Sequence, residues 1–360
     1  MPRSFSSSRR RITGLRLSAL GIDRPRAADP VEAVRSLLAA QAQDFPGALW
    51  AIGLRTPGTT IETVRAAIED GRIVRAWPMR GTLHLVAAED LGWITALTRD
   101  RAIRGAAGRH RQLELDEPDF ALADRVARIA LANGPLDRTE LLSAIQHAGL
   151  ATTGQRGPHV LQRLALTGVI VFAGQNSFAL VEQWIPNPRQ LERDAALAEL
   201  AIRYFHGHGP ATERDLSWWS SLSLREVREG IALAGDALEV ATIDEVRYFH
   251  RPGLEPAASG VHLLPGFDEY ILGYTDRSAP LAGHDLAVVV PGGNGMFIST
   301  VVVNGEVTGI WRRTSSAKGV KVALELFRPL SATTLSVVDR RLQRYARFVG
   351  SPVTRVEVSP

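Results

Sequence analysis

The apolar positions near the start of the chain repeat with the spacing of an amphipathic helix. Val31, Val34, Leu37 and Leu38 follow the i, i+3, i+4, i+7 pattern of a helix that packs one stripe against a core. Gln41 is the next position on this stripe. A buried amide without hydrogen-bond partners is costly, so this glutamine is either tied into the fold or kept for chemistry.

A second glutamine, Gln43, follows two residues later and precedes the turn-forming run 44–47. Phe45 comes before a proline and is disfavoured in the α region, so we expect the helix to end around these glutamines. In an extended or turning segment, residues i and i+2 point the same way. The carboxamides of Gln41 and Gln43 are therefore expected to converge on one small volume.

One order of elements recurs three times along the chain: three helices and then two strands. It is the order of a winged helix-turn-helix. The expected helices are 30–40, 47–54 and 61–70, then 120–132, 138–147 and 160–167, then 195–204, 213–220 and 223–233. The expected strand pairs are 73–77 with 82–86, 169–172 with 177–180, and 238–240 with 246–249.

From Val261 onward the pattern changes to short apolar strands, expected at 261–264, 286–290, 297–303, 306–311 and 320–326. Asn304-Gly305 lies between two of them and is a strong signal for a tight hairpin. The predicted fold class is α+β, with three tandem winged helix-turn-helix units and a C-terminal β-rich domain that carries a terminal helix. The predicted domains are 1–112, which contains both glutamines, 113–190, 191–257 and 258–360.

Composition narrows the possible chemistry. The chain of 360 residues is 45% hydrophobic, which suffices for a sizeable core. No apolar run is long enough to span a membrane and the Arg-rich start lacks a signal-peptide core, so we expect a cytoplasmic, nucleoid-associated protein. The absence of cysteine excludes disulfides and thiolate sites. His206 and His208 fall in a Gly-rich turn where a solvated loop is favoured over a metal site, and no cofactor is expected.

The positive charge is clustered. Net charge is only +4, but Lys318 and Lys321 are the sole lysines, so almost all of the 42 basic residues are arginines. Arginine patches suit a polyanion, although solvated helix faces explain any one patch equally well. The three basic stretches are Arg3, Arg9, Arg10, Arg11 and Arg16; Arg99, Arg101, Arg104, Arg109 and Arg111; and Arg340, Arg341, Arg344 and Arg347.

Several separated segments resemble the AlkZ/YcaQ-type winged-helix DNA glycosylases. They are 40–44, 77–86, 264–270, and 294–297 with 309–313, in the same order and over nearly the whole chain. The resemblance implies a C-shaped, positively lined clamp around duplex DNA with a DNA-probing hairpin in the β-rich part. It also implies excision of N7-alkylated purines, including the unhooking of interstrand crosslinks made by bis-alkylating natural products in antibiotic self-resistance.

The resemblance maps a catalytic Gln-x-Gln or Gln-x-Asp element onto Gln41 and Gln43. Glutamine at the second position resembles the crosslink-specialised branch of the family. Asp44 is expected to cap the next helix, with activation of water by its carboxylate beside the pair as the alternative. The candidate DNA-binding residues are Arg80, His84, Asn294, Met296, Phe297, Arg312 and Arg313.

Each candidate DNA contact also has a structural alternative. The arginines could form surface ion pairs, His84 could pack against its strand, and Phe297 could belong to the core, whereas Met296 at a loop tip could wedge between bases. Asp268 and Glu269 would repel phosphate, so we expect them to pair with arginines inside the fold.

The glutamine pair suits one kind of substrate. An N7-alkylguanine already carries a positive charge, so the site needs only to stabilise an oxocarbenium-like sugar and to place a water molecule. Carboxamide oxygens accept hydrogen bonds but are poor bases, and would not serve a neutral base such as uracil. Because both lysines are remote in sequence from Gln41, we expect no Schiff-base lyase activity.

The expected partner is double-stranded DNA that carries alkylpurine or crosslink adducts, bound by a monomer away from any membrane. The alternative is a non-enzymatic transcriptional regulator that uses its winged helices to recognise a specific sequence.

Overall fold

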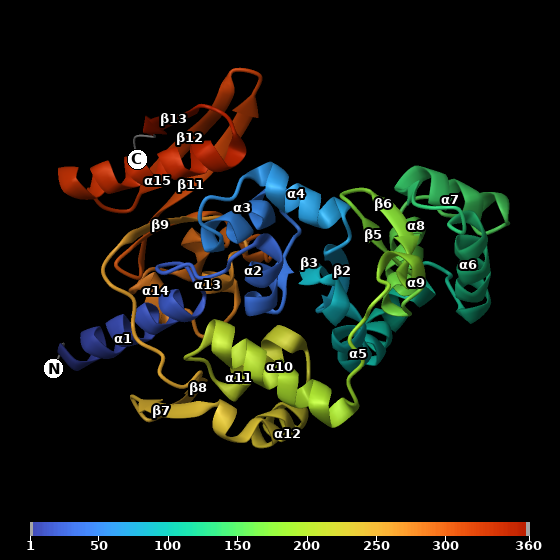
Figure 1. Cartoon of the computed structure of the whole chain (residues 1–360), viewed down its shortest axis with the longest axis horizontal. Helices are drawn as coiled ribbons and strands as arrows, with labels where there is room; N and C mark the ends of the chain where they lie inside the picture. The colour runs from blue at the N-terminus through green and yellow to red at the C-terminus, as the bar shows by residue number, and fades with distance from the viewer. Residues whose placement is uncertain (1–2, 358–360) are drawn as a thin grey trace.

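The chain folds into helices and mostly antiparallel sheets, as the α+β prediction requires, and the computed structural model describes residues 3–357 (Figure 1). Side chains are described for residues 7–356, so that of Arg3 lies outside this range. Within the described residues, no helix has the length and apolarity needed to cross a membrane. Helix α1 (Arg3–Ala19) comes first and is followed by three repeats of one order of elements.

The first repeat consists of α2 (Pro30–Leu37), β1 (Ala40–Gln41), α3 (Phe45–Arg55), α4 (Ile61–Glu69), β2 (Ile73–Met79) and β3 (Thr82–Ala87). Its helices begin where the sequence supplies caps. The Asp29 side chain accepts a hydrogen bond from the backbone N–H of Glu32, and Thr60 does the same for Thr63. The long helix α5 (Leu91–Gln112) follows.

The second repeat contains α6 (Glu117–Ala130), β4 (Leu136–Asp137), α7 (Arg138–His147), α8 (Arg156–Leu166), β5 (Ile170–Ala173) and β6 (Ser177–Leu180), followed by the single turn α9 (Val181–Trp184). It has a hydrophobic core of its own around Phe120, Leu141 and Phe178. Reciprocal capping boxes start α6 and α7. This repeat therefore forms a compact lobe, seen at the right of Figure 1.

The third repeat contains α10 (Arg193–His208), α11 (Glu213–Ser220), α12 (Leu224–Ala234), β7 (Glu239–Ile243) and β8 (Val246–His250). A single bridge between Ala211 and Phe249 takes the place of the short strand. The prediction of a solvated His206–His208 turn is wrong, because α10 continues to His208. The imidazole of His208 is fully buried and stacks on Tyr204, with ring centres 4.5 Å apart.

The C-terminal part contains β9 (Val261–Leu264), α13 (Glu269–Leu272), α14 (Ser278–Leu281), β10 (Thr300–Val303), β11 (Glu306–Ser316), β12 (Gly319–Leu326), α15 (Ala332–Val349) and β13 (Val353–Glu357). The strands form one sheet in the order β13-β12-β11-β10-β9. Asn304 and Gly305 have φ of 54° and 84°, which confirms the predicted hairpin turn. The strand expected at 286–290 is wrong, because Leu286–Val288 forms a 3₁₀ turn.

One six-stranded sheet joins the first two repeats. Its order is β1-β3-β2-β5-β6-β4, so the hairpins of the two repeats meet edge to edge between β2 and β5. The registered pair at this junction is Arg75 with Phe172. Hydrogen bonding across the junction places the second repeat relative to the first.

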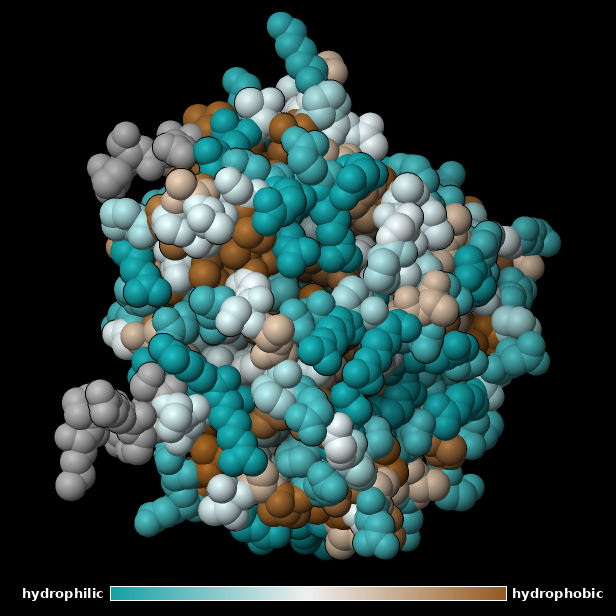
Figure 2. Space-filling view, turned by 60° about the vertical axis from the view of Figure 1, so that its left-hand side comes forward, coloured by the Kyte–Doolittle hydropathy of each residue, from teal (hydrophilic) through white to brown (hydrophobic). Residues whose placement is uncertain are grey.

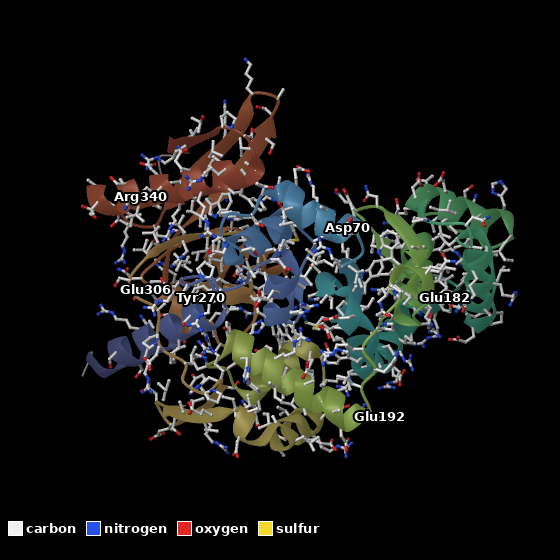
Figure 3. All side chains as sticks on the ribbon, in the orientation of Figure 1. Asp70, Glu182, Glu192, Tyr270, Glu306 and Arg340 are labelled. Carbon is white, nitrogen blue, oxygen red and sulfur yellow. The ribbon has the colours of Figure 1, made fainter. Side chains whose placement is uncertain are left out.

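The largest hydrophobic core joins the first repeat to the C-terminal part. Trp50 of α3 packs against Tyr345 and Phe348 of α15, with ring centres 5.0 and 5.1 Å apart. Gly53 permits this approach, because a Cβ atom there would lie 2.4 Å from the Phe348 ring. Tyr270, labelled inside the molecule in Figure 3, donates to the carbonyl of Gly305. The face in Figure 2 is mainly hydrophilic, with its hydrophobic residues in separate patches.

Several arginines of the basic stretches serve the fold. Arg16 lies in α1, is buried, and stacks on Tyr274 with 3.5 Å between Cζ and the ring centre. Arg101 of α5 pairs with Glu226. Arg344 donates to the carbonyl oxygen of Leu54. These side chains contribute to the fold, and the binding of a polyanion by the basic stretches stays a prediction.

A buried ion pair fixes the first repeat against the C-terminal part. Arg55 of α3 donates to both carboxylate oxygens of Asp268, at 2.9 and 3.1 Å, and also to the carbonyls of Leu20 and Ala51. Both side chains are almost fully buried. The expectation that Asp268 pairs with an arginine is confirmed.

We expect Asp268→Asn to lower the free energy of unfolding by about 3–5 kcal/mol, because it leaves the buried Arg55 charge without its counter-ion. Urea unfolding measures this loss. Glu62→Gln, which breaks the exposed Arg65–Glu62 pair, is the control and should cost less than about 1 kcal/mol. Equal losses in the two variants would contradict the structural role of the pair.

Candidate active site

A strained residue turns the chain from α2 into β1. Leu38 has φ of 65° and ψ of −50°, a conformation that is unfavourable for a leucine. The helix therefore ends at Leu37, and the expectation that it continues to Ala40 is wrong. The next residues pair with β3, and Gln41 lies opposite His84. The position of Gln41 is thus set by strand pairing with β3, and not by the apolar face of a helix.

The two glutamines converge, as their spacing predicted. The Nε2 atom of Gln41 donates to Oε1 of Gln43 at 2.5 Å. Gln41 is only 7% exposed, whereas Gln43 is exposed. The inner amide therefore orients the outer one, and the outer amide faces solvent. An oxygen that already accepts one hydrogen bond keeps a second lone pair for water.

Arg80 covers the inner glutamine. It lies in the tight turn between β2 and β3, where Arg80 and Gly81 have φ of 55° and 66°. Its Nη2 donates to Oε1 of Gln41 at 3.4 Å and contacts Nε2 of His84 at 3.1 Å. Burial lowers the pKa of Arg80, while the negative charge of Glu269 opposes this shift. The site thus contains a cation at the Gln41 carboxamide.

His84 is the buried partner of the Arg80 guanidinium. Its imidazole is fully buried, and its Nδ1 lies 2.9 Å from the carbonyl oxygen of Thr82. Burial, together with the charge of Arg80, lowers the pKa of His84 to about 3. A neutral imidazole can donate from Nδ1 and accept from Arg80 at Nε2. Its prediction as a DNA contact is wrong, because the ring packs beneath the surface.

Asp44 does not cap α3 with its side chain, so that prediction is wrong. Both of its carboxylate oxygens accept from Nη2 of Arg313 in β11, at 2.6 and 2.8 Å. Gly47 makes room for this arrangement, since a Cβ atom there would lie 2.4 Å from the Asp44 carboxylate. The ion pair joins the residue after Gln43 to the C-terminal sheet. Arg313, predicted to bind DNA, serves here as the partner of Asp44.

Arg75 is a site residue that the sequence analysis missed. Its Nη2 donates at 3.0 Å to the carbonyl of Ala42, the residue between the two glutamines. Its guanidinium lies 5.3 Å from the ring centres of both Phe45 and Phe172. The available signal was an arginine between the apolar residues of a predicted strand. Sequence alone gave no partner for it.

Glu269 lies buried close to this cluster. Its Oε2 accepts from the indole of Trp219 at 2.9 Å and contacts Nε2 of His208 at 3.2 Å. The expectation of an arginine partner is wrong for this residue. Burial raises the pKa of Glu269, but the hydrogen bond and charge of His208 lower it overall, with Arg80 contributing. A buried negative charge therefore faces the arginine of the site.

The remaining predicted DNA contacts lie in the C-terminal part. Arg312 is exposed and pairs with Glu325 at 2.9 Å. The Asn294 side chain accepts from the backbone N–H of Met296, which fixes a turn with Met296 exposed. Phe297 is half-buried and packs near Phe267. Their binding to DNA stays a prediction.

A cavity of about 320 Å³ opens beside Arg80, and its lining includes Thr98, Arg101 and Gln162. It lies between helices α5 and α8, next to the turn that carries Arg80. In the described part of the chain, no three histidine or acidic side chains are grouped to hold a metal ion. The polar groups of the site are amides, guanidiniums, the His84 imidazole and the carboxylates of Asp44 and Glu269.

Comparisons with known proteins agree on one family. The model of the family described as "DNA glycosylase AlkZ-like" matches residues 34–348. An interstrand DNA cross-link repair glycosylase of Streptomyces sahachiroi is 26% identical over 309 residues, which cover 78% of this chain and 81% of that protein. The solved structure of the Streptomyces sahachiroi DNA glycosylase AlkZ has a TM-score of 0.79 at 23% identity, covering 96% and 99% of the two chains.

We expect His84 to make the fold sensitive to acid. The unfolded chain gains a proton at this residue near pH 6.5, whereas folded His84 resists it down to about pH 3. Its contribution to stability is therefore lost as pH falls below 6.5, by at most about 1.4 kcal/mol per pH unit. The free energy of unfolding of His84→Gln should decline less steeply than that of the wild type.

Urea unfolding between pH 7 and about pH 5 measures this difference in slope. His147→Gln, which changes an exposed histidine of α7, is the control. Identical slopes for the wild type and His84→Gln would contradict the neutral, buried imidazole.

Proposed function

Because the chain belongs to the AlkZ-like DNA glycosylase family, we propose that it hydrolyses the N-glycosidic bond of N7-alkylated purines in duplex DNA. The observation that carries this proposal is the hydrogen-bonded pair Gln41–Gln43, with its inner member buried and its outer member exposed. Membership confirms the prediction of a glycosylase enzyme, and it weighs against a non-enzymatic regulator.

In the proposed mechanism, the glutamines act as a unit. Gln41 donates to Gln43 and thereby fixes the direction of the Gln43 oxygen. The free lone pair of that oxygen accepts a hydrogen bond from the attacking water, and its dipole stabilises positive charge that develops on the sugar. Arg75 supports the geometry, because it holds the backbone carbonyl between the two residues.

The weakness of this site as a base defines its substrate. Asp44 is the nearest carboxylate along the chain, and Arg313 pairs with both of its oxygens. The cation of Arg80 at Gln41 further disfavours proton uptake. Such a site depends on a leaving group that is already activated. An N7-alkylpurine meets this condition because its positive charge weakens the glycosidic bond.

We propose that the three repeats are winged helices that together form a C-shaped clamp on duplex DNA. Each has the predicted order of helices followed by a two-stranded hairpin, and the chain shares its fold with the solved DNA glycosylase AlkZ over nearly its whole length. The cross-link repair named for the Streptomyces relative supports crosslink unhooking as an activity. We propose in addition that this activity serves self-resistance to a bis-alkylating metabolite.

We also propose a monofunctional enzyme. Arg313 of the C-terminal sheet contacts Asp44, the residue after Gln43. The sheet that carries the lysines therefore packs near the glutamine motif, although the lysines are far from it in sequence. Strand alternation nevertheless separates them, because Lys321 pairs with Thr314 and projects opposite to the face of Arg313. Lys318 lies in the turn beyond Ser316. The Lys321 amine is therefore not on the face that carries Arg313 to Asp44.

We expect Gln41→Ala and Gln43→Ala each to slow the release of 7-methylguanine from methylated duplex DNA by roughly a hundredfold, because either change removes an oriented dipole at the sugar. Chromatography of the released base measures the rate. Gln155→Ala, which removes an exposed glutamine before α8, is the matched control and should keep full activity. Retained activity in both site variants would exclude the glutamine mechanism.

We expect the product to contain an intact abasic site. Borohydride added during the reaction should trap no covalent adduct between the protein and alkylated DNA, since no amine attacks the sugar. Gel electrophoresis under denaturing conditions detects such an adduct. An adduct that disappears in Lys321→Arg would overturn the monofunctional proposal.

A further inference from the structure

Guanidinium and aromatic groups alternate in a ladder that begins at the glutamine pair. Arg80, which donates to Gln41, has its Cζ atom 5.0 Å from the ring centre of Trp218. The Cζ atom of Arg277 lies 5.1 Å from the same ring and 5.2 Å from that of Phe297. The first repeat, the third repeat and the C-terminal part each supply a member of this ladder.

Trp218 is the outward-facing member of a tryptophan pair on α11. Trp219 is fully buried and donates to Glu269, which anchors the helix. Trp218 is 39% exposed and is the aromatic residue among the exposed large hydrophobic side chains that the structure describes. Its indole N–H has no hydrogen-bond partner within the described residues. The indole is therefore available to a ligand beside the glutamine pair.

The two arginines around this ring lack direct counter-ions. Among the described side chains, no carboxylate lies within ion-pair distance of Arg80 or Arg277, whereas Arg101 pairs with Glu226. Burial lowers the pKa of Arg277; the charge of Asp215 opposes this shift, and the charge of Arg80 adds to it. The Nε atom of Arg80 is buried without a partner in the described region. Two close cations of this kind are stabilised by an added anion.

We propose that Trp218, Arg80 and Arg277 bind the alkylated nucleotide itself, with the purinium ring on the indole and the adjacent phosphate on the guanidiniums. This inference rests on the proposed function. An N7-alkylpurinium is planar and cationic, and indole is the side chain that binds such cations best. The guanidiniums already seated at the ring show that it accepts planar cations. Arginine is in turn well suited to bind phosphate.

This assignment makes Trp218 a specificity-determining residue. A neutral purine of the same shape can stack on the indole but gains no cation–π attraction. Because Arg80 bonds Gln41 as well, a phosphate held by Arg80 brings the neighbouring sugar toward the exposed oxygen of Gln43. Recognition of charge by Trp218 and positioning of the reactive bond by Arg80 thus take place at neighbouring side chains.

Two duplexes of matched shape test the proposal. One contains N7-methylguanine on a 2′-fluoro sugar, which resists cleavage, and the other contains the neutral isostere 7-methyl-7-deazaguanine. Fluorescence anisotropy measures the affinity for each. We expect the wild type to prefer the cationic duplex, and Trp218→Leu to reduce this preference roughly tenfold, with Trp218→Phe intermediate.

Ile129→Ala, an exposed apolar residue on α6, is the control and should keep the preference. An unchanged preference in Trp218→Leu would overturn the inference. If Trp218→Leu does not fold, Trp218→Phe is used in its place. An unchanged preference for the cationic duplex in Trp218→Phe would then overturn the inference.

Release of 7-methylguanine, measured in parallel, separates the two proposals. An unchanged preference in the Trp218 variants together with lost release in Gln41→Ala would overturn the nucleotide site and leave the glycosylase proposal standing. Lost preference in the Trp218 variants without any release by the wild type would support the nucleotide site and contradict the proposed activity.

Discussion

The geometry of the site depends on a two-residue strand. Ala40 and Gln41 pair with Leu85 and His84 of β3, and this register sets the face of the sheet on which the Gln41 side chain lies. A shift by one residue would turn that side chain to the other face of the sheet. The strained backbone of Leu38, which ends α2 early, provides the register. The local cost of strain is thus compensated by the packing of two buried elements on either side.

The sequence predicted those elements whose apolar period and caps agree. The helix at 138–147 and the strand at 177–180 have their predicted bounds, because a capping aspartate and turn residues mark their ends. Helix α5 was missed, since its second half is mostly arginine, alanine and glycine without an apolar stripe. The run 286–290 is apolar enough for a strand, but it forms a 3₁₀ turn, and apolar content alone does not distinguish the two.

For the candidate site, the sequence predicted the convergence of the glutamines but not the groups that hold them. Spacing of two residues is a local property, so the contact between Gln41 and Gln43 could be foreseen. Their partners come from distant segments: Arg80 from a hairpin turn and Arg313 from the C-terminal sheet. Which charge meets which depends on how repeats pack together. The burial of His84 beneath Arg80 is a result of that packing, and no pattern along one strand reveals it.

Arg75 gives the molecule a mechanical property. Its backbone pairs with Phe172 of the second repeat, its guanidinium lies near that ring, and its outer nitrogen holds the carbonyl of Ala42. The same residue is therefore part of the joint between two lobes and of the support beneath the glutamine motif. A displacement of the second repeat relative to the first therefore acts on this residue and through it on the motif. The position of the second repeat and the alignment of the amides are in this way mechanically coupled through one side chain.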